Sequence, residues 1–343
     1  MAIGLSFKRV FFEQDAMDYP LGKKLYSDFK RDGFQIEFLR SHNRVTGIPG
    51  KTPSEAFSQG KNTLVVGVRR TLDFASCKPS AHYQIPLVTG CGGMCEYCYL
   101  NTQMGKKPYT RIYVNIDDIL TRANNYIEER KPEITFFEAA ATSDPIAVEP
   151  YTGTIAKAID FFSALEYGRL RLVTKFSFVD SLLELNHKKH TRIRFSINTN
   201  SVIKDFEHRT PKLSERLRGL SEVLAHGYPG GVIIAPVILQ GEWEKNYTAM
   251  LEEMRDEFNH IENIDLHFEV ISHRFTRRAR KNITEVFPNT KLPMNEETDR
   301  RFQYGQFGYG KFVYTKEKIE QMKDFFYNTI HELFPGAVID YII

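Results

Sequence analysis

No stretch of eighteen consecutive apolar residues occurs in the 343-residue chain, so we expect no membrane-spanning helix. The first residues, MAIGLSFKRVFF, lack the long apolar core and small-residue cleavage site of a secretory signal, which favours a cytoplasmic protein. Only four cysteines are present and three are clustered, so a disulfide framework is excluded and a metal site is favoured. We find no internal repeat or low-complexity tract, and a net charge of +3 is too small to indicate a nucleic-acid partner by itself.

Short apolar runs alternate with helical patterns between residues 83 and 270. The expected strands are 83–89, 133–140, 170–176, 191–198, 231–237 and 264–270, and the expected helices are 116–131, 153–168, 211–227 and 244–261. Strands of nearly uniform apolar character between helices indicate a parallel sheet covered by helices. Six such units are fewer than the eight of a closed barrel. The sequence therefore predicts an α/β fold, an open, partial (β/α)6 barrel.

The segments on either side of this barrel differ from it. Residues 1–82 are expected to form an N-terminal α/β extension, with an amphipathic helix at 20–34, strands at 35–39 and 63–70, and a connecting loop at 47–62. Residues 271–343 are expected to add a basic loop, a β-hairpin with its turn near 308–310, a helix at 316–334 and a strand at 337–343. We thus predict three parts, 1–82, 83–270 and 271–343.

Three cysteines, Cys91, Cys95 and Cys98, directly follow the first barrel strand, at the edge where such barrels carry their active sites. One interpretation is a structural zinc site with Cys77 as the fourth ligand, although that spacing is long and such sites commonly use two C-x2-C pairs. The other is a [4Fe–4S] cluster held by three thiolates, with the fourth iron open to a substrate or cofactor. We favour the cluster.

The spacing C-x3-C-x2-C, with an aromatic residue directly before the last cysteine, resembles the signature of the radical S-adenosylmethionine enzymes. The resemblance implies that S-adenosylmethionine chelates the open iron and yields a 5′-deoxyadenosyl radical, while the protein binds and orients the reactants. It also implies the partial barrel that the strand–helix alternation predicts.

The longer segments TGCGGMCEYCYLNTQ, FFEAAATSDP, RFSINT and YGQFGYGKFVY resemble the spore photoproduct lyase family. This resemblance implies a lyase that repairs 5-thyminyl-5,6-dihydrothymine in the DNA of germinating spores, beginning with hydrogen abstraction from C6 of the lesion. It also implies an electron donor such as flavodoxin or ferredoxin. Tyr97 and Tyr99 match the family's two radical-relay tyrosines; from the sequence alone, aromatic packing beside the cluster explains them equally well.

One position departs from the family. The cysteine that returns a hydrogen to the thymine radical lies after FFEAA, where this chain has Ala141. Alanine has no abstractable S–H, so we expect cofactor binding and lesion fragmentation to persist but the final hydrogen donation to be impaired.

Cofactor contacts are expected at the carboxyl ends of the strands. Ser143 takes the place of a common Gly-Gly-Glu segment, Lys175 ends an apolar strand and so needs an anionic partner or solvent, and Ser196, Asn198 and Tyr97 complete the set. A strand-end Ser or Asn is more often a turn or helix cap, so these assignments depend on the resemblance.

Positive charge concentrates in SHRFTRRARKNI. Such a run is often a solvated face, but here aromatic and glycine-rich residues follow it, and a stacked lesion must be turned out of the duplex to react. The expected DNA contacts are His273, Arg274, Arg277, Arg278, Arg280, Lys281, Arg301, Tyr304, Tyr309 and Lys311. Two alternatives stay open: a radical enzyme acting on another nucleic-acid or peptide substrate, and a non-catalytic, zinc-stabilised DNA-binding protein.

Overall fold

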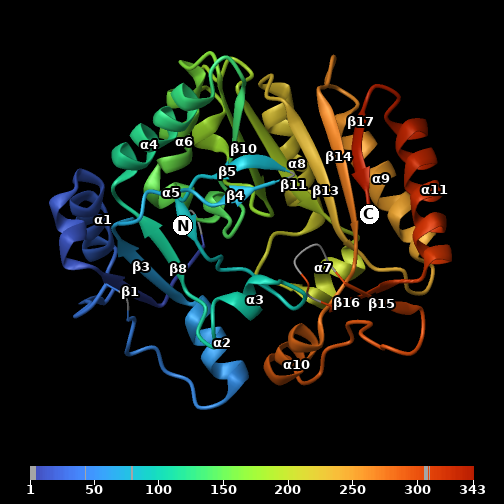
Figure 1. Ribbon diagram of the computed structural model, residues 1–343, viewed down its shortest axis with the longest axis horizontal. Coiled ribbons are helices and arrows are strands. Elements are labelled where there is room, and N and C mark those ends of the chain that lie inside the picture. The colour runs from blue at the N-terminus through green and yellow to red at the C-terminus, as the bar shows by residue number, and fades with distance from the viewer. Residues whose placement is uncertain (1–4, 43, 79, 305–307, 309) are drawn as a thin grey trace. The chain divides into compact units, whose positions relative to one another are not determined.

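The computed structural model describes residues 5–42, 44–78, 80–304, 308 and 310–343 (Figure 1). Within it the chain forms two compact units. The first comprises Met1–Gly92 with Met104–Arg192, and the second comprises Gly93–Gln103 with Ile193–Ile343.

A five-stranded sheet forms the N-terminal part of the first unit. Its strand order is β2-β1-β3-β8-β6, parallel except for β6 against β8. The strands are β1 (Arg9–Phe12), β2 (Ile36–Phe38), β3 (Thr63–Gly67), β6 (Val88–Thr89) and β8 (Thr110–Tyr113), and the helices are η1 (Gln14–Asp18), α1 (Pro20–Arg31) and α2 (Pro53–Lys61). The predicted loop at 47–62 is wrong over α2. The Thr52 side chain accepts a hydrogen bond from Glu55 N at 3.2 Å and Pro53 opens the helix, so local capping starts a helix in a Gly- and Pro-rich segment.

Four barrel strands complete the first unit in the order β10-β9-β5-β4. They are β4 (Ser76–Cys77), β5 (Ala81–Gln84), β9 (Thr135–Glu138) and β10 (Gly168–Thr174), with β5, β9 and β10 mutually parallel. Helices α4 (Ile116–Arg130) and α6 (Thr154–Ser163) lie side by side against β9 and β10 (Figure 1). The shorter elements are η2 (Pro145–Val148), α5 (Glu149–Thr152) and η3 (Asp180–Leu182). The strand predicted at 83–89 is divided between β5 and β6, which belong to different sheets.

Parallel strands in the order β11-β13-β14-β17 form the centre of the second unit. They are β11 (Thr191–Ile197), β13 (Gly230–Val237), β14 (Leu266–Ser272) and β17 (Val338–Ile342), and the helices are α7 (Asn200–Phe206), α8 (Leu213–Ala225), α9 (Trp243–Phe258) and α11 (Lys316–Leu333). Helices α9 and α11 run side by side (Figure 1) and are joined by ring contacts such as Tyr247 with Phe326 at 5.3 Å. Each apolar run predicted as a strand therefore carries one.

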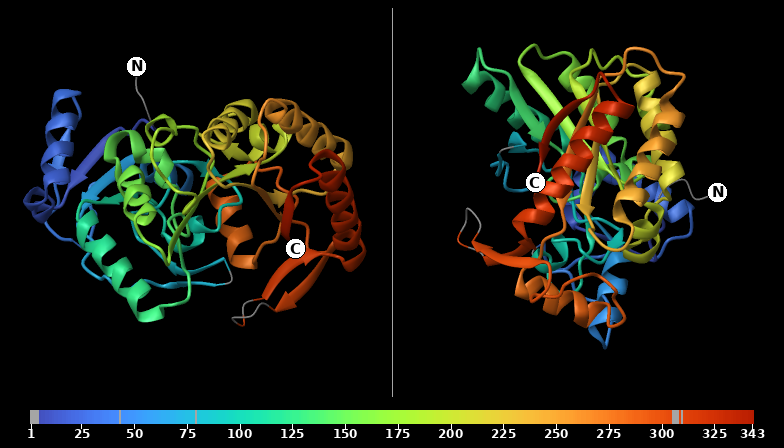
Figure 2. Two further views of the ribbon diagram at one scale, coloured as in Figure 1. Left: turned by 90° about the horizontal axis from the view of Figure 1, so that it is seen from above. Right: turned by 90° about the vertical axis from the view of Figure 1, so that its right-hand side faces the viewer.

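Smaller elements of the second unit carry Cys95 and most of the candidate DNA contacts. They are β7 (Met94–Cys95), α3 (Leu100–Gln103), β12 (Glu207–His208), α10 (Arg277–Val286), β15 (Arg300–Tyr304) and β16 (Gly310–Tyr314). Antiparallel pairing of β15 with β16 confirms the predicted hairpin, which projects from the second unit in both views of Figure 2. The predicted basic loop is wrong over α10, because Thr276 accepts a hydrogen bond from Ala279 N at 3.0 Å and starts a helix there.

Among the described residues, no helix combines the length and the apolar character required to cross a bilayer.

Candidate active site

The cysteine loop begins in the first unit with an anchored backbone. Gly90 has φ of +80°, and a Cβ there would lie 2.3 Å from the carbonyl oxygen of Tyr109, so only glycine fits. Gly90 N donates to Thr142 O at 2.9 Å, and the buried Lys61 donates through Nζ to Cys91 O at 2.8 Å. The start of the loop is therefore held by both its amide and its carbonyl groups.

The rest of the loop belongs to the second unit, where β7 pairs with β12 in antiparallel register. Cys95 lies opposite Glu207 in this pairing, and Cys98 N donates to Cys95 O at 3.3 Å, so a tight turn relates the last two cysteines. The buried Glu96 is bound at both oxygens: His208 Nε2 lies 2.8 Å from Oε1, and the Thr290 hydroxyl donates to Oε2. The protein itself thus fixes the backbone around Cys95.

All four cysteines lie within the described residues and none forms a disulfide. Cys95 is buried, whereas Cys77, Cys91 and Cys98 are half-buried. Across the described part of the chain, no three His, Cys, Asp or Glu side chains gather into a ready-made metal site. Cys91 belongs to one compact unit and the other two cysteines of the cluster to the other.

Tyr97 and Tyr99 lie in different surroundings. The Tyr97 hydroxyl donates to Glu207 Oε1, and its ring packs on an apolar cluster that includes Phe206, Ile238 and Phe312. Burial, and then the Glu207 carboxylate, hold the pKa of Tyr97 well above its usual value. Tyr99 is 56% exposed. Of the two candidate relay tyrosines, Tyr97 is thus half-buried and Tyr99 is exposed.

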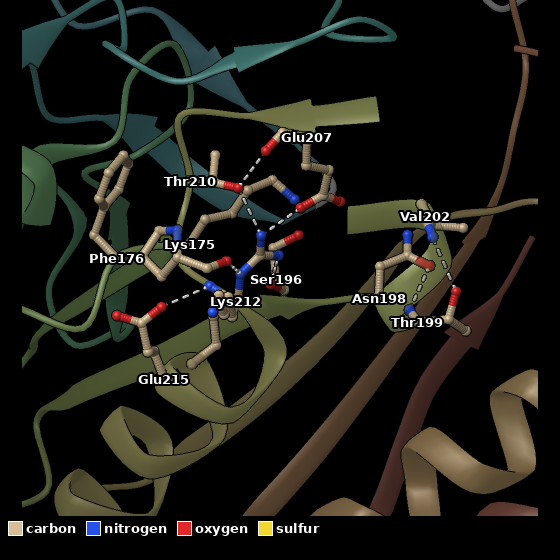
Figure 3. Close-up of polar contacts among 12 residues, drawn as sticks. Lys175, Phe176, Ser196, Asn198, Thr199, Val202, Glu207, Thr210, Lys212 and Glu215 are labelled. Atoms are coloured by element: carbon tan, nitrogen blue, oxygen red, sulfur yellow. Dashed lines mark hydrogen bonds and ion pairs between the residues drawn. The ribbon is translucent and has the colours of Figure 1, made fainter. Parts of the chain in front are cut away.

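The acceptor of the Tyr97 hydrogen bond is part of a buried ion pair that sequence reasoning missed. Arg216 is fully buried, and its guanidinium lies 2.6 Å from Glu207 Oε2. The same guanidinium donates to Pro211 O, to Ser196 O and to the Thr210 hydroxyl at 2.8–3.0 Å. Figure 3 draws these contacts around Glu207, Thr210 and Ser196. In the sequence, Arg216 resembles any other charged helix residue, so no local signal indicated its role.

Ala141 and Ser143 follow β9 at the edge reached by Gly90. Ser143 and Gly90 form an isolated parallel bridge, and Ser143 Oγ donates to Ala139 O at 3.3 Å. The next residue, Asp144, was not among the predicted site residues. It accepts from the Thr174 hydroxyl at 2.8 Å and from Lys175 N at 2.9 Å, and burial raises its pKa to about 6. Asp144 therefore ties the end of β9 to the end of β10, and so places Lys175.

Asn198 is fully buried and extensively hydrogen-bonded. Its Nδ2 donates to Pro236 O at 2.9 Å, and its Oδ1 accepts from Thr199 N at 3.0 Å and from the Tyr247 hydroxyl at 2.9 Å. Figure 3 shows its contact with Thr199. Ser196 is also buried, and its carbonyl accepts from Arg216. The structure gives both residues a part in holding the carboxyl end of β11.

The predicted DNA contacts divide into buried and exposed groups. His273 is 2% exposed; burial, and then the nearby Arg300 cation, lower its pKa to about 3, so it is neutral. Arg300 donates to His273 O at 2.5 Å and to Nδ1 at 3.0 Å, and it lies 3.6 Å from the centre of the Tyr314 ring. His273 thus supports the base of the hairpin and presents no cation to solvent, which corrects its expected role as an exposed phosphate contact.

The exposed or half-buried group lies on α10, on the segment just before it and on the hairpin. Arg277 and Arg280 both pair with Glu296, at 3.4 and 3.0 Å. Lys311 is half-buried, and burial followed by the nearby Arg274 cation lowers its pKa. The remaining exposed members are Arg274, Arg278, Lys281, Arg301 and Tyr304, the last 72% exposed. Tyr309 lies outside the described residues.

Comparisons with known proteins found matches over nearly the whole chain. Residues 6–343 match the sequence model of the family described as "Spore photoproduct lyase". The spore photoproduct lyase of Clostridium acetobutylicum is 52% identical over 337 residues, which is 98% of this chain and 99% of the relative. Two solved structures of 46% identity cover 99% of this chain and 100% of their own, each with a TM-score of 0.95. One is a spore photoproduct lyase complexed with dinucleoside spore photoproduct, and the other is a double mutant, cysteine to alanine and serine to cysteine, with bound AdoMet and the same dinucleoside.

Proposed function

The chain belongs to the spore photoproduct lyase family, and we propose that it is a DNA repair lyase that returns the spore photoproduct to two thymines. The full-length match to a structure that holds the dinucleoside lesion is the observation that carries this proposal. The chain is a lyase, and the expected fold class, a partial barrel of the radical S-adenosylmethionine type, is confirmed by the same match. The zinc-stabilised binding protein and the radical enzyme with another substrate are not favoured.

The cofactors implied by the family are a [4Fe–4S] cluster and S-adenosylmethionine. We assign the cluster to Cys91, Cys95 and Cys98, because three closely spaced thiolates, with the fourth cysteine fourteen residues before the first of them, suit it better than a four-ligand structural zinc site. When bound and reduced, the pair supplies a 5′-deoxyadenosyl radical. We place S-adenosylmethionine against Tyr97, Ser143, Lys175, Ser196 and Asn198, and an AdoMet-bound relative supports such a site.

The protein's own part is to present C6 of the lesion and to complete the thymine afterwards. We propose that Tyr97 and Tyr99 relay the radical after fragmentation. The exposed cations of α10 and the hairpin bind DNA phosphates. We further propose that flavodoxin or ferredoxin supplies the electron and that the protein acts in the cytoplasm of the bacterial spore. We also propose that the chain has three functional parts, at 1–82, 83–270 and 271–343.

Hydrogen donation is the step in which we expect this chain to differ from its family, because Ala141 replaces the donor cysteine. With Ala141, donation is impaired unless another thiol takes over, and the double-mutant relative suggests which one. Its serine-to-cysteine position precedes its cysteine-to-alanine position by the same number of residues as Cys77 precedes Ala141. Cys77 lies on β4, in the same sheet as the β9 strand that leads to Ala141. We therefore take Cys77 as the candidate donor, with impaired donation as the alternative.

Anaerobic reaction of the reconstituted chain with dinucleoside spore photoproduct tests the function, with thymidine products separated and quantified. Lesion consumption that depends on S-adenosylmethionine is expected, and no consumption would refute the proposed lyase. Cys77→Ser and Ala141→Cys variants, assayed in parallel, test the donor. Loss of intact thymidine in Cys77→Ser, restored in the double variant, supports Cys77. A poor yield in the unmodified chain, raised by Ala141→Cys alone, supports impaired donation.

A further inference from the structure

A pocket of about 280 Å³ opens in the second unit between α7 and the segment that joins β13 to α9. None of the residues proposed above to hold the cluster, the cofactor or the DNA lines it. Its floor is apolar and formed by Val202, Phe206, Ile238 and Tyr247. Its lining therefore differs from the proposed cofactor and DNA contacts, although its floor shares Phe206 and Ile238 with the cluster on which Tyr97 packs.

The floor is apolar because the one polar group on it is already engaged. The Tyr247 hydroxyl donates to Asn198 Oδ1 at 2.9 Å and accepts from Ile238 N at 3.0 Å. The ring is thus left as a fixed apolar surface. A ligand that fills the floor must bring a flat or apolar face.

The rim of the pocket carries polar side chains that form no hydrogen bond or ion pair with other described residues. Gln240 and Asn246 are exposed, and neither side chain hydrogen-bonds within the described residues. Lys291 and Asp205 also line the pocket, and neither forms an ion pair there, again counting only described residues. Their opposite charges cancel. The rim therefore offers amide donors and acceptors in a nearly neutral setting.

One wall is Trp243, the single tryptophan of the chain. Its indole packs edge-to-face on Phe325, with ring centroids 5.0 Å apart, which fixes its orientation. Aromatic rings stack on nucleobases of any sequence, and Asn and Gln amides pair with base edges. The volume lies just below the usual range for small-molecule sites, which suits one base or nucleoside better than a dinucleotide.

We propose that this pocket binds a single nucleobase, stacked on Trp243 and read by the amides of Gln240 and Asn246. The base comes either from an unpaired nucleotide of a DNA strand or from a free nucleoside. Only the first source rests on the proposed function, because nucleoside binding needs no lesion chemistry.

The single tryptophan makes the test direct. The full-length chain is titrated with each of the four deoxynucleosides, and Trp243 emission is followed. We expect a saturable change that depends little on salt, because no phosphate is neutralised. An undamaged single-stranded oligonucleotide that produces the same change assigns the pocket to DNA, and a response to monomers alone assigns it to free nucleosides.

Matched variants localise the signal. Ser201→Tyr places a bulky ring at the mouth of the pocket, and Ser214→Tyr makes the same change at the second residue of α8, away from it. Ser201→Tyr is expected to abolish the emission change and Ser214→Tyr to keep it. Asn246→Ala, at an exposed position that should not disturb folding, is expected to weaken binding by about 5- to 100-fold.

Two results would overturn the proposal: no saturable change with any deoxynucleoside, or an unchanged affinity in both Ser201→Tyr and Asn246→Ala. Lesion turnover is measured separately on the reconstituted chain. The pocket can therefore fail while the lyase function stands, and the reverse is equally visible.

Discussion

Replacing Arg216 by methionine should strongly destabilise the second unit. Methionine keeps much of the volume but removes the charge, so the buried Glu207 carboxylate loses the guanidinium that lies 2.6 Å from its Oε2. Breaking a buried ion pair from one side costs about 3–5 kcal/mol. For a folding unit of this size, that loss lowers the melting temperature by roughly 6–20 °C.

The chain offers a matched control two residues away. Arg218 is exposed on the same helix, α8, and Arg218→Met removes the same charge from a solvated position, with an expected effect within about 0.5 kcal/mol. Thermal and urea unfolding of the unmodified chain and both variants, followed by circular dichroism, measures the difference.

A second variant separates the charge from the packing. In Glu207→Gln/Arg216→Met the buried charges are gone together, while the glutamine can still accept the Tyr97 hydrogen bond. Much of the lost stability should return, because replacing both members of a buried pair is commonly far less costly than removing one. If Arg216→Met unfolds at the same denaturant concentration as Arg218→Met, the ion pair does not stabilise this unit and the reasoning fails.

Three further outcomes are expected. Gly90→Ala should lower the free energy of unfolding by at least about 1 kcal/mol more than Gly105→Ala does. Both glycines have positive φ, but only at position 90 would the added Cβ clash with the backbone. Equal urea midpoints for the two variants would contradict this prediction. An unfolded histidine takes up a proton near pH 6.5, whereas His273 in the folded protein stays neutral down to about pH 3, so the free energy of unfolding falls as the pH drops below 6.5. Between pH 7 and 5 the unmodified chain should lose about 2 kcal/mol of stability that His273→Asn does not lose. Equal losses in the two proteins, measured by urea unfolding, would refute this prediction. Glu296→Gln removes the carboxylate that pairs with two α10 arginines, so it should tighten DNA binding about two- to fivefold at low salt and steepen the salt dependence. Glu297→Gln is the control and should leave DNA binding unchanged. Identical binding curves for the two variants in a mobility-shift assay would exclude α10 from the DNA surface.

Most strands of the barrel could be predicted from sequence because they are compact runs rich in apolar residues, as expected for parallel strands between helices. The two-residue strand β4 was not predicted. Two of the helices that were missed, α2 and α10, begin at a threonine cap in segments whose composition suggests a loop. In α2 the order Thr52, Pro53, Glu55 carries the start signal, so the order of the residues was more informative there than the glycine and proline content.

The grouping of the last two cysteines could be predicted from their spacing, because a local turn brings Cys98 back to Cys95. The residues that hold this loop and the nearby strand ends could not, because Glu207, Arg216 and Asp144 act through contacts between distant segments. Nothing near Asp144 in the sequence shows that its carboxylate meets the end of β10. The same limit explains His273, whose place in a basic run suggested exposure, whereas Arg300 and the hairpin bury it.

The pairing of β7 with β12 also bears on how the proposed iron–sulfur cluster is inserted and replaced. Fixing a residue's backbone costs about 1–2 kcal/mol in conformational entropy. Around Cys95 that cost is met when the chain folds, since β12, Glu96 and its partners hold the loop by protein contacts alone. If the proposed cluster were lost by oxidation, we therefore expect this half of the loop to stay in place. Rebuilding the cluster would then require iron and sulfide but little reordering of the backbone around Cys95.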